Sequence, residues 1–286
     1  MEFIKKNDET VLVVKEYELR NGNTMPLLHF PLLEQTGIVN HCFTTRLGGV
    51  SQGDCATLNL SFARGDDVEA VEKNFDLLAE AMGISIEDFV FSDQTHTTNI
   101  MKVTSEHRGS GIIKAKNYSD IDGFITNEPN IMLSTFYADC VPLYFVDTVK
   151  KAIGLSHSGW KGTLNRMGQK TLEAMKEAYG TNPDDVICAI APSVCVDCYE
   201  VSEDVASAFR AEFQGHEDEI LTAKPNGKYQ LDLWKANEIV LLEAGIKKEH
   251  LSITNICTCC NSKVLFSHRA SRGRRGNLGA FLGLKV

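Results

Sequence analysis

The sequence has no apolar run that approaches the ~20 residues needed to span a bilayer. Residues 1–8 contain no apolar core of the kind found in signal peptides. No dense block of Lys and Arg precedes the C-terminal region, and the net charge of −9 repels phosphate backbones. We therefore expect a soluble, cytoplasmic protein that binds neither membranes nor nucleic acid.

The chain also lacks internal repeats, low-complexity linkers and any break in composition. Its 286 residues, of which 43% are hydrophobic and 23% charged, have the composition of an ordinary soluble globular protein. A chain of this length can bury roughly 75% of its unfolded surface. We expect one domain or two closely packed halves, present as a monomer or a weak homo-oligomer.

Nine cysteines are scattered along the chain, and with no export signal this odd count favours reduced thiols over a disulfide framework. Five of them form two close groups, Cys195 with Cys198, and Cys257 with Cys259 and Cys260. Two such groups could form a structural tetrathiolate zinc site. The second group is more tightly spaced than a usual zinc knuckle, and buried reduced thiols explain the residues equally well. Both interpretations stay open.

The most informative stretch is residues 131–163. Three short apolar runs, at 131–137, 143–146 and 152–156, are typical of buried strands. Cys140 lies between the first two, and His157 lies at the mouth of the turn that follows the third. Strand ends of α/β sheets are where functional sites tend to form.

Apolar residues at helical spacing predict a helix at residues 66–82, capped by Asp66 and closed by Gly83. A second helix is expected at residues 163–179, with Thr163 as its cap. These elements indicate an α/β or α+β fold with a mixed sheet flanked by helices. Further helices are expected at residues 202–213 and 232–244, and further strands at 11–14, 27–33, 37–45, 186–191 and 251–256.

Two segments could bind an anion. Arg46 begins a Gly-rich turn at residues 46–51, which is either an ordinary turn with a solvated arginine or an anion-binding loop. Lys161, Gly162 and Thr163 lie at the expected start of a helix, where free backbone N–H groups attract anions.

His96, Cys140 and His157 could supply the three protein ligands of a catalytic zinc, which leaves a fourth position open. No two of them lie within one turn of each other, so spacing alone explains them equally well as a core cysteine and two hydrogen-bonded histidines. A Cys140–His157 thiol hydrolase is a third hypothesis. Asp139 would point to the opposite face of an extended segment, which leaves a dyad rather than a triad.

Two metal-enzyme classes find no support. A zinc deaminase signature needs His-x-Glu upstream of Pro-Cys-x-x-Cys, but no His-x-Glu occurs and Pro192 is not adjacent to Cys195. Multicopper sites require paired histidines of the His-x-His kind, and none of the eight histidines is paired in this way.

Several ordered motifs nevertheless resemble one known family, and the similarity covers nearly the whole chain from about Gly37 onward. The family comprises bacterial purine nucleoside phosphorylases once labelled multicopper polyphenol oxidases or laccases, together with the mammalian laccase-domain proteins. The motifs are Arg46-Leu47-Gly48-Gly49-Val50-Ser51, Leu58-Asn59-Leu60, Gln94-Thr95-His96, Ala138-Asp139-Cys140-Val141-Pro142, His157-Ser158-Gly159-Trp160-Lys161-Gly162-Thr163, Cys198-Tyr199-Glu200-Val201 and Phe266-Ser267-His268-Arg269.

The resemblance implies one zinc ion bound by His96, Cys140 and His157, with copper as an alternative metal. It implies phosphorolysis of adenosine, inosine and methylthioadenosine, with a secondary adenosine deaminase activity; polyphenol oxidation is disfavoured. The implied fold is a mixed α/β sandwich, with N-terminal strands at residues 1–36 packed on a catalytic domain at 37–286. The same fold resembles a deamidating bacterial toxin with a Cys–His site, which keeps the thiol-hydrolase hypothesis open.

On this hypothesis, zinc would activate a water for attack on C6 of adenine during deamination, and Asp139 could shuttle the proton. Phosphorolysis needs an anion pocket, for which Arg46 and residues 161–163 are the candidates. The family's closing motif commonly ends Gly-Arg, whereas this chain has Arg275-Gly276-Asn277. Arg274 or Arg275 could substitute for that arginine.

Overall fold

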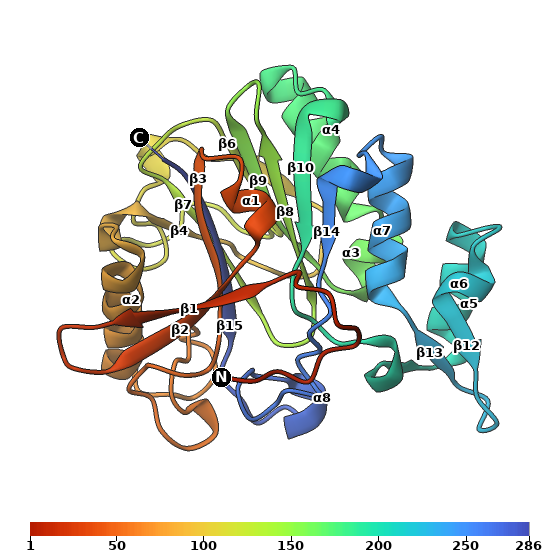
Figure 1. The fold of residues 1–286 in the computed structure, drawn as a ribbon, viewed down its shortest axis with the longest axis horizontal. Helices are drawn as coiled ribbons and strands as arrows, with labels where there is room; N and C mark the ends of the chain where they lie inside the picture. The colour runs from red at the N-terminus through yellow and green to blue at the C-terminus, as the bar shows by residue number, and fades with distance from the viewer. Residues whose placement is uncertain (286) are drawn as a thin grey trace.

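Two six-stranded mixed β-sheets face each other at the centre of the molecule (Figure 1). The structure is a computed structural model that describes residues 1–285. In spatial order the first sheet contains β1 (Val13–Glu18), β2 (Thr24–His29), β3 (Val39–Thr44), β15 (Leu278–Leu284), β7 (Met132–Tyr137) and β4 (Phe89–Phe91). The second contains β14 (Leu251–Ile253), β10 (Val186–Ile190), β8 (Val141–Asp147), β9 (Ala152–Ser158), β6 (Gly123–Thr126) and β5 (Ile100–Lys102).

The inner faces of the two sheets share one hydrophobic core. Phe43 of β3 packs there with Tyr144 and Leu155 of the second sheet. The Tyr144 hydroxyl donates a hydrogen bond of 2.7 Å to the carbonyl of Cys42, which joins the sheets directly. Strands β8 and β9 are buried along their full length, since helices cover their outer face. The predicted mixed sandwich flanked by helices is therefore confirmed.

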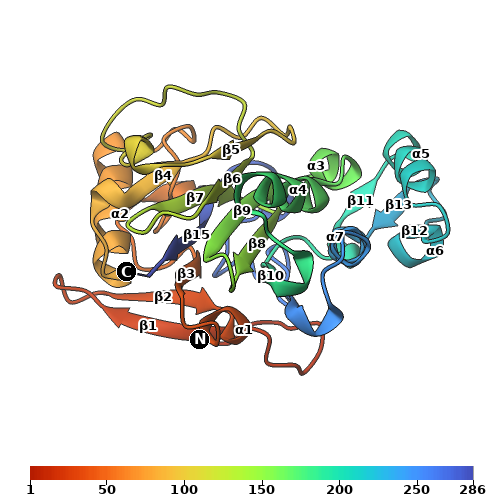
Figure 2. The same cartoon turned by 90° about the horizontal axis from the view of Figure 1, so that it is seen from above.

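Amphipathic helices cover the outer faces. Helix α2 (Val68–Met82) packs on the first sheet, and α4 (Met167–Tyr179) and α7 (Leu233–Glu243) pack on the second (Figures 1 and 2). No helix within residues 1–285 is long and apolar enough to cross a membrane. The remaining helices are α1 (Pro31–Glu34), α3 (Trp160–Leu164), α5 (Glu203–Glu212), α6 (Glu217–Ile220) and α8 (His268–Ser271). A small sheet of β11 (Glu200–Val201), β13 (Tyr229–Leu231) and β12 (Leu221–Ala223) lies with α5 and α6 at one end (Figure 2).

The helix expected at residues 163–179 is two helices. Arg166 adopts the left-handed conformation (φ 58°), which ends α3 and starts α4 in a new direction. The prediction that Thr163 caps a helix is wrong, because Thr163 lies inside α3 and its buried hydroxyl bonds Ser158 and Asn237. In α2 the capping residue is Asp67, one position later than expected.

Strand boundaries set the positions of the two central site residues. Strand β7 ends at Tyr137 and β8 begins at Val141, so Cys140 lies in the short link between them, as predicted. Strand β9 continues to Ser158, so His157 lies inside a strand rather than in the turn beyond it. Its side chain is therefore held by the sheet.

The Gly-rich turn after β3 is held by protein groups. Asn74 of α2 accepts a hydrogen bond from the Val50 N–H at 2.8 Å and donates to the Ser51 hydroxyl, also at 2.8 Å. A Cβ at Gly49 would lie 2.3 Å from the Thr57 carbonyl, so this glycine serves close backbone packing. Arg46 donates to the carbonyl of Ala56 at 2.7 Å. Of the two interpretations, these contacts favour the turn, although its arginine is half-buried rather than solvated.

Replacing Asn74 by Ala should lower the free energy of unfolding by about 2–4 kcal/mol, because the Val50 N–H, the Asn59 carbonyl and the Ser51 hydroxyl lose their partner. Chemical denaturation followed by circular dichroism measures this loss. Lys73→Ala, at an exposed position of the same helix, is the matched control and should change stability by less than about 0.5 kcal/mol. Equal effects of the two substitutions would contradict this role of Asn74.

Candidate metal centre

Three side chains that are distant in sequence converge at one edge of the sandwich. His96 lies in the loop after β4, Cys140 in the link between β7 and β8, and His157 in β9. Their potential ligand atoms all lie within 4.8 Å of one another. The Cys140 Sγ and the His96 Nε2 are 4.0 Å apart, and the two imidazole rings meet edge to face at 4.9 Å.

The backbone around these residues has unusual conformations. His96 (φ 66°) and Asp139 (φ 87°) are both left-handed, which costs a non-glycine residue on the order of 1 kcal/mol. Gly159 completes the enclosure, since a Cβ there would lie 3.0 Å from the His96 ring and 3.2 Å from the Cys140 sulfur. Two strained residues and one glycine without a side chain thus allow the three side chains to come together.

A buried carboxylate, Asp122, orients two of the three residues. Its Oδ1 accepts a 2.7 Å hydrogen bond from Nδ1 of His157, which leaves Nε2 of His157 free for a ligand. The same carboxylate accepts the backbone N–H groups of Thr95, His96 and Thr97 and the Thr97 hydroxyl. Carboxylate–histidine pairs of this kind are the usual support of a metal-binding imidazole.

The charges of the site favour a thiolate. Burial opposes ionisation of the Cys140 thiol, but the neighbouring His157 and His96 outweigh it and lower the pKa of Cys140. Burial would also lower the pKa of His157, but the Cys140 thiolate and Asp122 raise it. The hydrogen bond from His157 holds the pKa of Asp122 well below its usual range, against the effect of its burial. A thiolate is the form of cysteine that binds metals and the form that acts as a nucleophile.

The donor set fits zinc. Zn–S and Zn–N bonds of about 2.3 and 2.0–2.1 Å place tetrahedral sulfur and nitrogen ligands roughly 3.5 Å apart. The observed separation of 4.0 Å between Cys140 and His96 needs only a small inward movement, and the exposed His96 can make it. Three protein ligands leave one position open, as in catalytic zinc sites.

Asp139 faces away from these three residues. The residue is 8% exposed, and its carboxylate accepts 2.6 Å hydrogen bonds from the Thr258 hydroxyl and the Arg269 backbone N–H. It therefore holds the link that carries Cys140. The segment is not extended as expected, since Asp139 is left-handed (φ 87°), but the Asp139 carboxylate still bonds groups other than the three site residues.

His96, Cys140 and His157 lie in the lining of a cleft of about 440 Å³. The cleft has an aromatic wall, and two arginines, Arg64 and Arg275, line it as well. Arg275 is only 9% exposed, and its burial and the nearby Arg64 lower the pKa of Arg275 to about 10. The aromatic lining residues are Phe62, Phe91 and Phe136.

The other residues expected to bind phosphate lie elsewhere. Arg46 stacks on the Phe266 ring at 4.4 Å, and Lys161 lies over the Trp160 ring at 5.6 Å. Thr163 donates its backbone N–H to Gly159 at 2.8 Å. Neither Arg46 nor residues 161–163 belong to the cleft lining found within residues 1–285.

The sequence alone does not indicate that Asp122, Phe62 and Arg64 belong to the site. Nothing in the sequence links Asp122 to His157, 35 positions later. Arg64 follows Phe62 in a loop without strand or helix periodicity. An arginine two residues after an aromatic residue in such a loop is the only available signal.

The chain is a mixed β-sandwich in which one cysteine and two histidines converge at one edge. Comparison with known proteins identifies the family to which it belongs. The model of the family described as multi-copper polyphenol oxidoreductase laccase matches residues 40–285. The chain belongs to this family, which confirms the resemblance seen in the sequence.

Similar proteins support the same assignment. The chain is 36% identical over 247 residues to a Bacillus subtilis protein named purine nucleoside phosphorylase YlmD, covering 85% of this chain and 87% of that protein. Crystal structures of YfiH from Bacillus licheniformis and YlmD from Geobacillus stearothermophilus superpose with TM-scores of 0.86 and 0.84. They are 33% and 32% identical to this chain, and each match covers 91% of it and 96% of the other chain.

Asp122→Asn should weaken metal binding by about 10- to 100-fold, because the amide holds the His157 ring and the His96 loop less well. Competition with a chromogenic chelator measures the affinity. Asp120→Asn is the matched control, two residues away and exposed, and should bind metal as the wild type does. Unchanged affinity in Asp122→Asn would contradict the orienting role.

Proposed function

We propose that this protein is a zinc-dependent purine nucleoside phosphorylase acting on adenosine, inosine and methylthioadenosine. The observation that carries the proposal is the position of His96, Cys140 and His157 in a cleft that also contains two arginines and an aromatic wall. The printed names of relatives such as the Bacillus subtilis protein support the substrate class. We propose adenosine deamination as a secondary activity of the same cleft.

The reaction transfers a ribosyl group. An oxygen of phosphate attacks C1′ of the ribose, the bond from C1′ to the purine nitrogen breaks, and that nitrogen leaves with the bonding electrons. Positive charge develops on the ribosyl group, and negative charge develops on the purine. The protein must therefore hold an anion beside C1′ and stabilise the departing base.

Arg64 and Arg275 are the residues that we propose for phosphate. The Nε of Arg275 is buried without a hydrogen-bond partner among residues 1–285, so it can donate to a ligand. An anion between the two guanidinium groups would offset their mutual repulsion, and arginine matches phosphate oxygens in geometry. The face of a phenylalanine such as Phe62 or Phe136 would stack on the purine.

His96, Cys140 and His157 would hold the zinc ion, which would supply a Lewis acid in the cleft. The hydrogen bond to Asp122 fixes the ring of His157 and occupies its Nδ1, so the Nε2 of His157 is the nitrogen left to bind the ion. Asp93 lines the cleft and pairs with Lys116, and its carboxylate is the group that we propose opposite the developing ribosyl cation.

Cys140→Ala should remove the zinc ion of the cleft, which lowers the zinc content by about one ion per chain, and should abolish the phosphate-dependent release of hypoxanthine from inosine. Metal content is measured by elemental analysis, and the release by chromatography with and without phosphate. Cys55→Ala, at a buried cysteine outside the cluster, is the control and should retain both. Activity that survives in Cys140→Ala would contradict the proposal.

Arg275→Ala should raise the KM for phosphate by on the order of 10- to 100-fold, because charge-assisted hydrogen bonds are lost, with little change in the KM for inosine. Steady-state kinetics at varied phosphate give this ratio. Arg274→Ala is the control, since Arg274 is exposed and does not line the cleft. A similar phosphate KM in both variants would exclude Arg275 as a phosphate ligand.

A thiol hydrolase is a second candidate, and Asp122 is the observation that favours it. Asp122 supplies the orienting third group that the dyad of Cys140 and His157 otherwise lacks. The two functions separate in metal-free protein. The hydrolase would still turn over after chelation and would be inactivated by iodoacetamide, whereas the phosphorylase would need zinc restored.

A further inference from the structure

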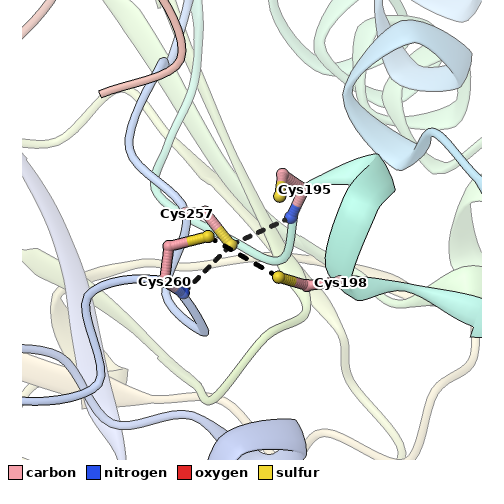
Figure 3. Close-up of side chains that lie close together, drawn as sticks. All are labelled: Cys195, Cys198, Cys257 and Cys260. Atoms are coloured by element: carbon pink, nitrogen blue, oxygen red, sulfur yellow. Dashed lines mark hydrogen bonds between the residues drawn. The ribbon is translucent and has the colours of Figure 1, made fainter. Parts of the chain in front are cut away.

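A second cluster of metal-binding side chains lies outside the cleft. Cys195 and Cys198 follow β10, Cys257 and Cys260 follow β14, and Figure 3 shows the four side chains gathered between the two loops. Their sulfur atoms all lie within 4.8 Å of one another. We call this group the four-cysteine cluster; Cys259, in the same loop, is not part of it.

The spacing of the sulfur atoms suits a shared ion better than a disulfide. The Sγ atoms of Cys198 and Cys260 are 3.6 Å apart, and all four cysteines are free thiols. Zn–S bonds of about 2.3 Å place the sulfur ligands of a tetrahedral ion roughly 3.8 Å apart. A disulfide requires about 2.05 Å, so this pair is already near the distance for common coordination.

Backbone groups point at the sulfur atoms. The N–H of Cys195 donates to the Sγ of Cys257 at 3.3 Å, and the N–H of Cys260 donates to the same sulfur at 3.5 Å (Figure 3). Hydrogen bonds of this kind stabilise the negative charge of metal-bound thiolates. Two residues separate Cys195 from Cys198, and two separate Cys257 from Cys260. The Cys198 N–H donates a hydrogen bond of 3.0 Å to the Cys195 carbonyl, which closes a turn between these two cysteines.

A lysine and the N-terminal segment enclose the cluster. Lys6 donates its backbone N–H to Asn255 at 2.9 Å, and its ammonium pairs with Asp197 at 2.8 Å. Lys6 therefore bridges the two cysteine-bearing loops and places a positive charge beside them. Four thiolates around a divalent ion carry a net charge of about −2, which such a cation would partly offset.

We propose that the four-cysteine cluster binds a structural zinc ion as a tetrathiolate. Four protein ligands leave no open position, which is the arrangement of structural rather than catalytic zinc, and soft thiolates select zinc over hard divalent ions. The ion would join the loops after β10 and β14, whose cysteines are 62 residues apart and whose backbones pair at Ser193 and Cys257.

The proposed ion also lies behind the wall of the cleft. Thr258, next to Cys257, donates its hydroxyl to the Asp139 carboxylate at 2.6 Å, and the Val194 N–H donates to the Asp139 carbonyl at 3.0 Å. Asp139 precedes Cys140. Both loops that would bind the structural zinc therefore also fix the link that carries the cleft thiol.

The test is a zinc count combined with X-ray absorption at the zinc edge. The wild type should bind about two zinc ions per chain, and Cys140→Ala, which removes the cleft ligand, should retain about one. In Cys140→Ala the absorption spectrum should show only sulfur neighbours, at about 2.3 Å. Cys198→Ser should lose this ion and lower the melting temperature, whereas the matched control Cys259→Ser should retain it.

Several outcomes would overturn the proposal. The first is a Cys140→Ala variant that folds but contains no zinc. The second and third are nitrogen neighbours at its remaining zinc site and iron in place of zinc. The fourth is a Cys198–Cys260 disulfide, found by thiol titration of freshly purified protein. If Cys198→Ser does not fold, the spectrum of Cys140→Ala still decides. The zinc count and the absorption spectrum do not depend on the proposed phosphorylase activity, because they are measured on Cys140→Ala, a variant that we expect to be inactive.

Discussion

The hydrogen bond between the buried Asp122 carboxylate and Nδ1 of His157 is the interaction on which the rest of the site depends. The same carboxylate receives three consecutive backbone N–H groups from the loop that carries His96. One side chain, which immediately precedes β6, therefore sets the ring orientation of one ligand and the backbone position of another. Because Asp122 is fully buried, losing any of these partners would leave polar groups unsatisfied, which makes the arrangement rigid.

The sandwich explains why the site forms at this edge. The link between β7 and β8 crosses from the first sheet to the second, and β9 lies beside β8 in the second sheet. Cys140 and His157 are thus brought together by strand pairing, which aligns Val141 with Ser158. The loop after β4 then adds His96 from the first sheet. The consequence is a cleft that contains the two arginines and the aromatic rings on which the proposed binding of phosphate and nucleoside rests.

Much of this was predictable from local sequence. Apolar runs bounded by turn residues located the strands around Cys140, and the glycine after Met82 located the end of α2. Contacts between distant segments were not predictable. Nothing in the sequence joins Asp122 to His157, and the break at Arg166 reflects a left-handed residue held by Glu212 and Glu243 rather than a helix-breaking residue. The convergence of His96, Cys140 and His157 was inferred from the resemblance, because the spacing of the three residues alone left the alternatives open.

We propose that one ion shared by two imidazoles and one sulfur faces the nucleoside. A crystal soaked with inosine and phosphate, with anomalous diffraction recorded on both sides of the zinc edge, tests it most directly. We expect an anomalous peak within bonding distance of His96, Cys140 and His157, with the nucleoside in the cleft and phosphate at Arg64 and Arg275. A metal-free cleft with substrate bound in it, or with the Cys140 sulfur covalently modified, would show that the shared ion is not part of the site.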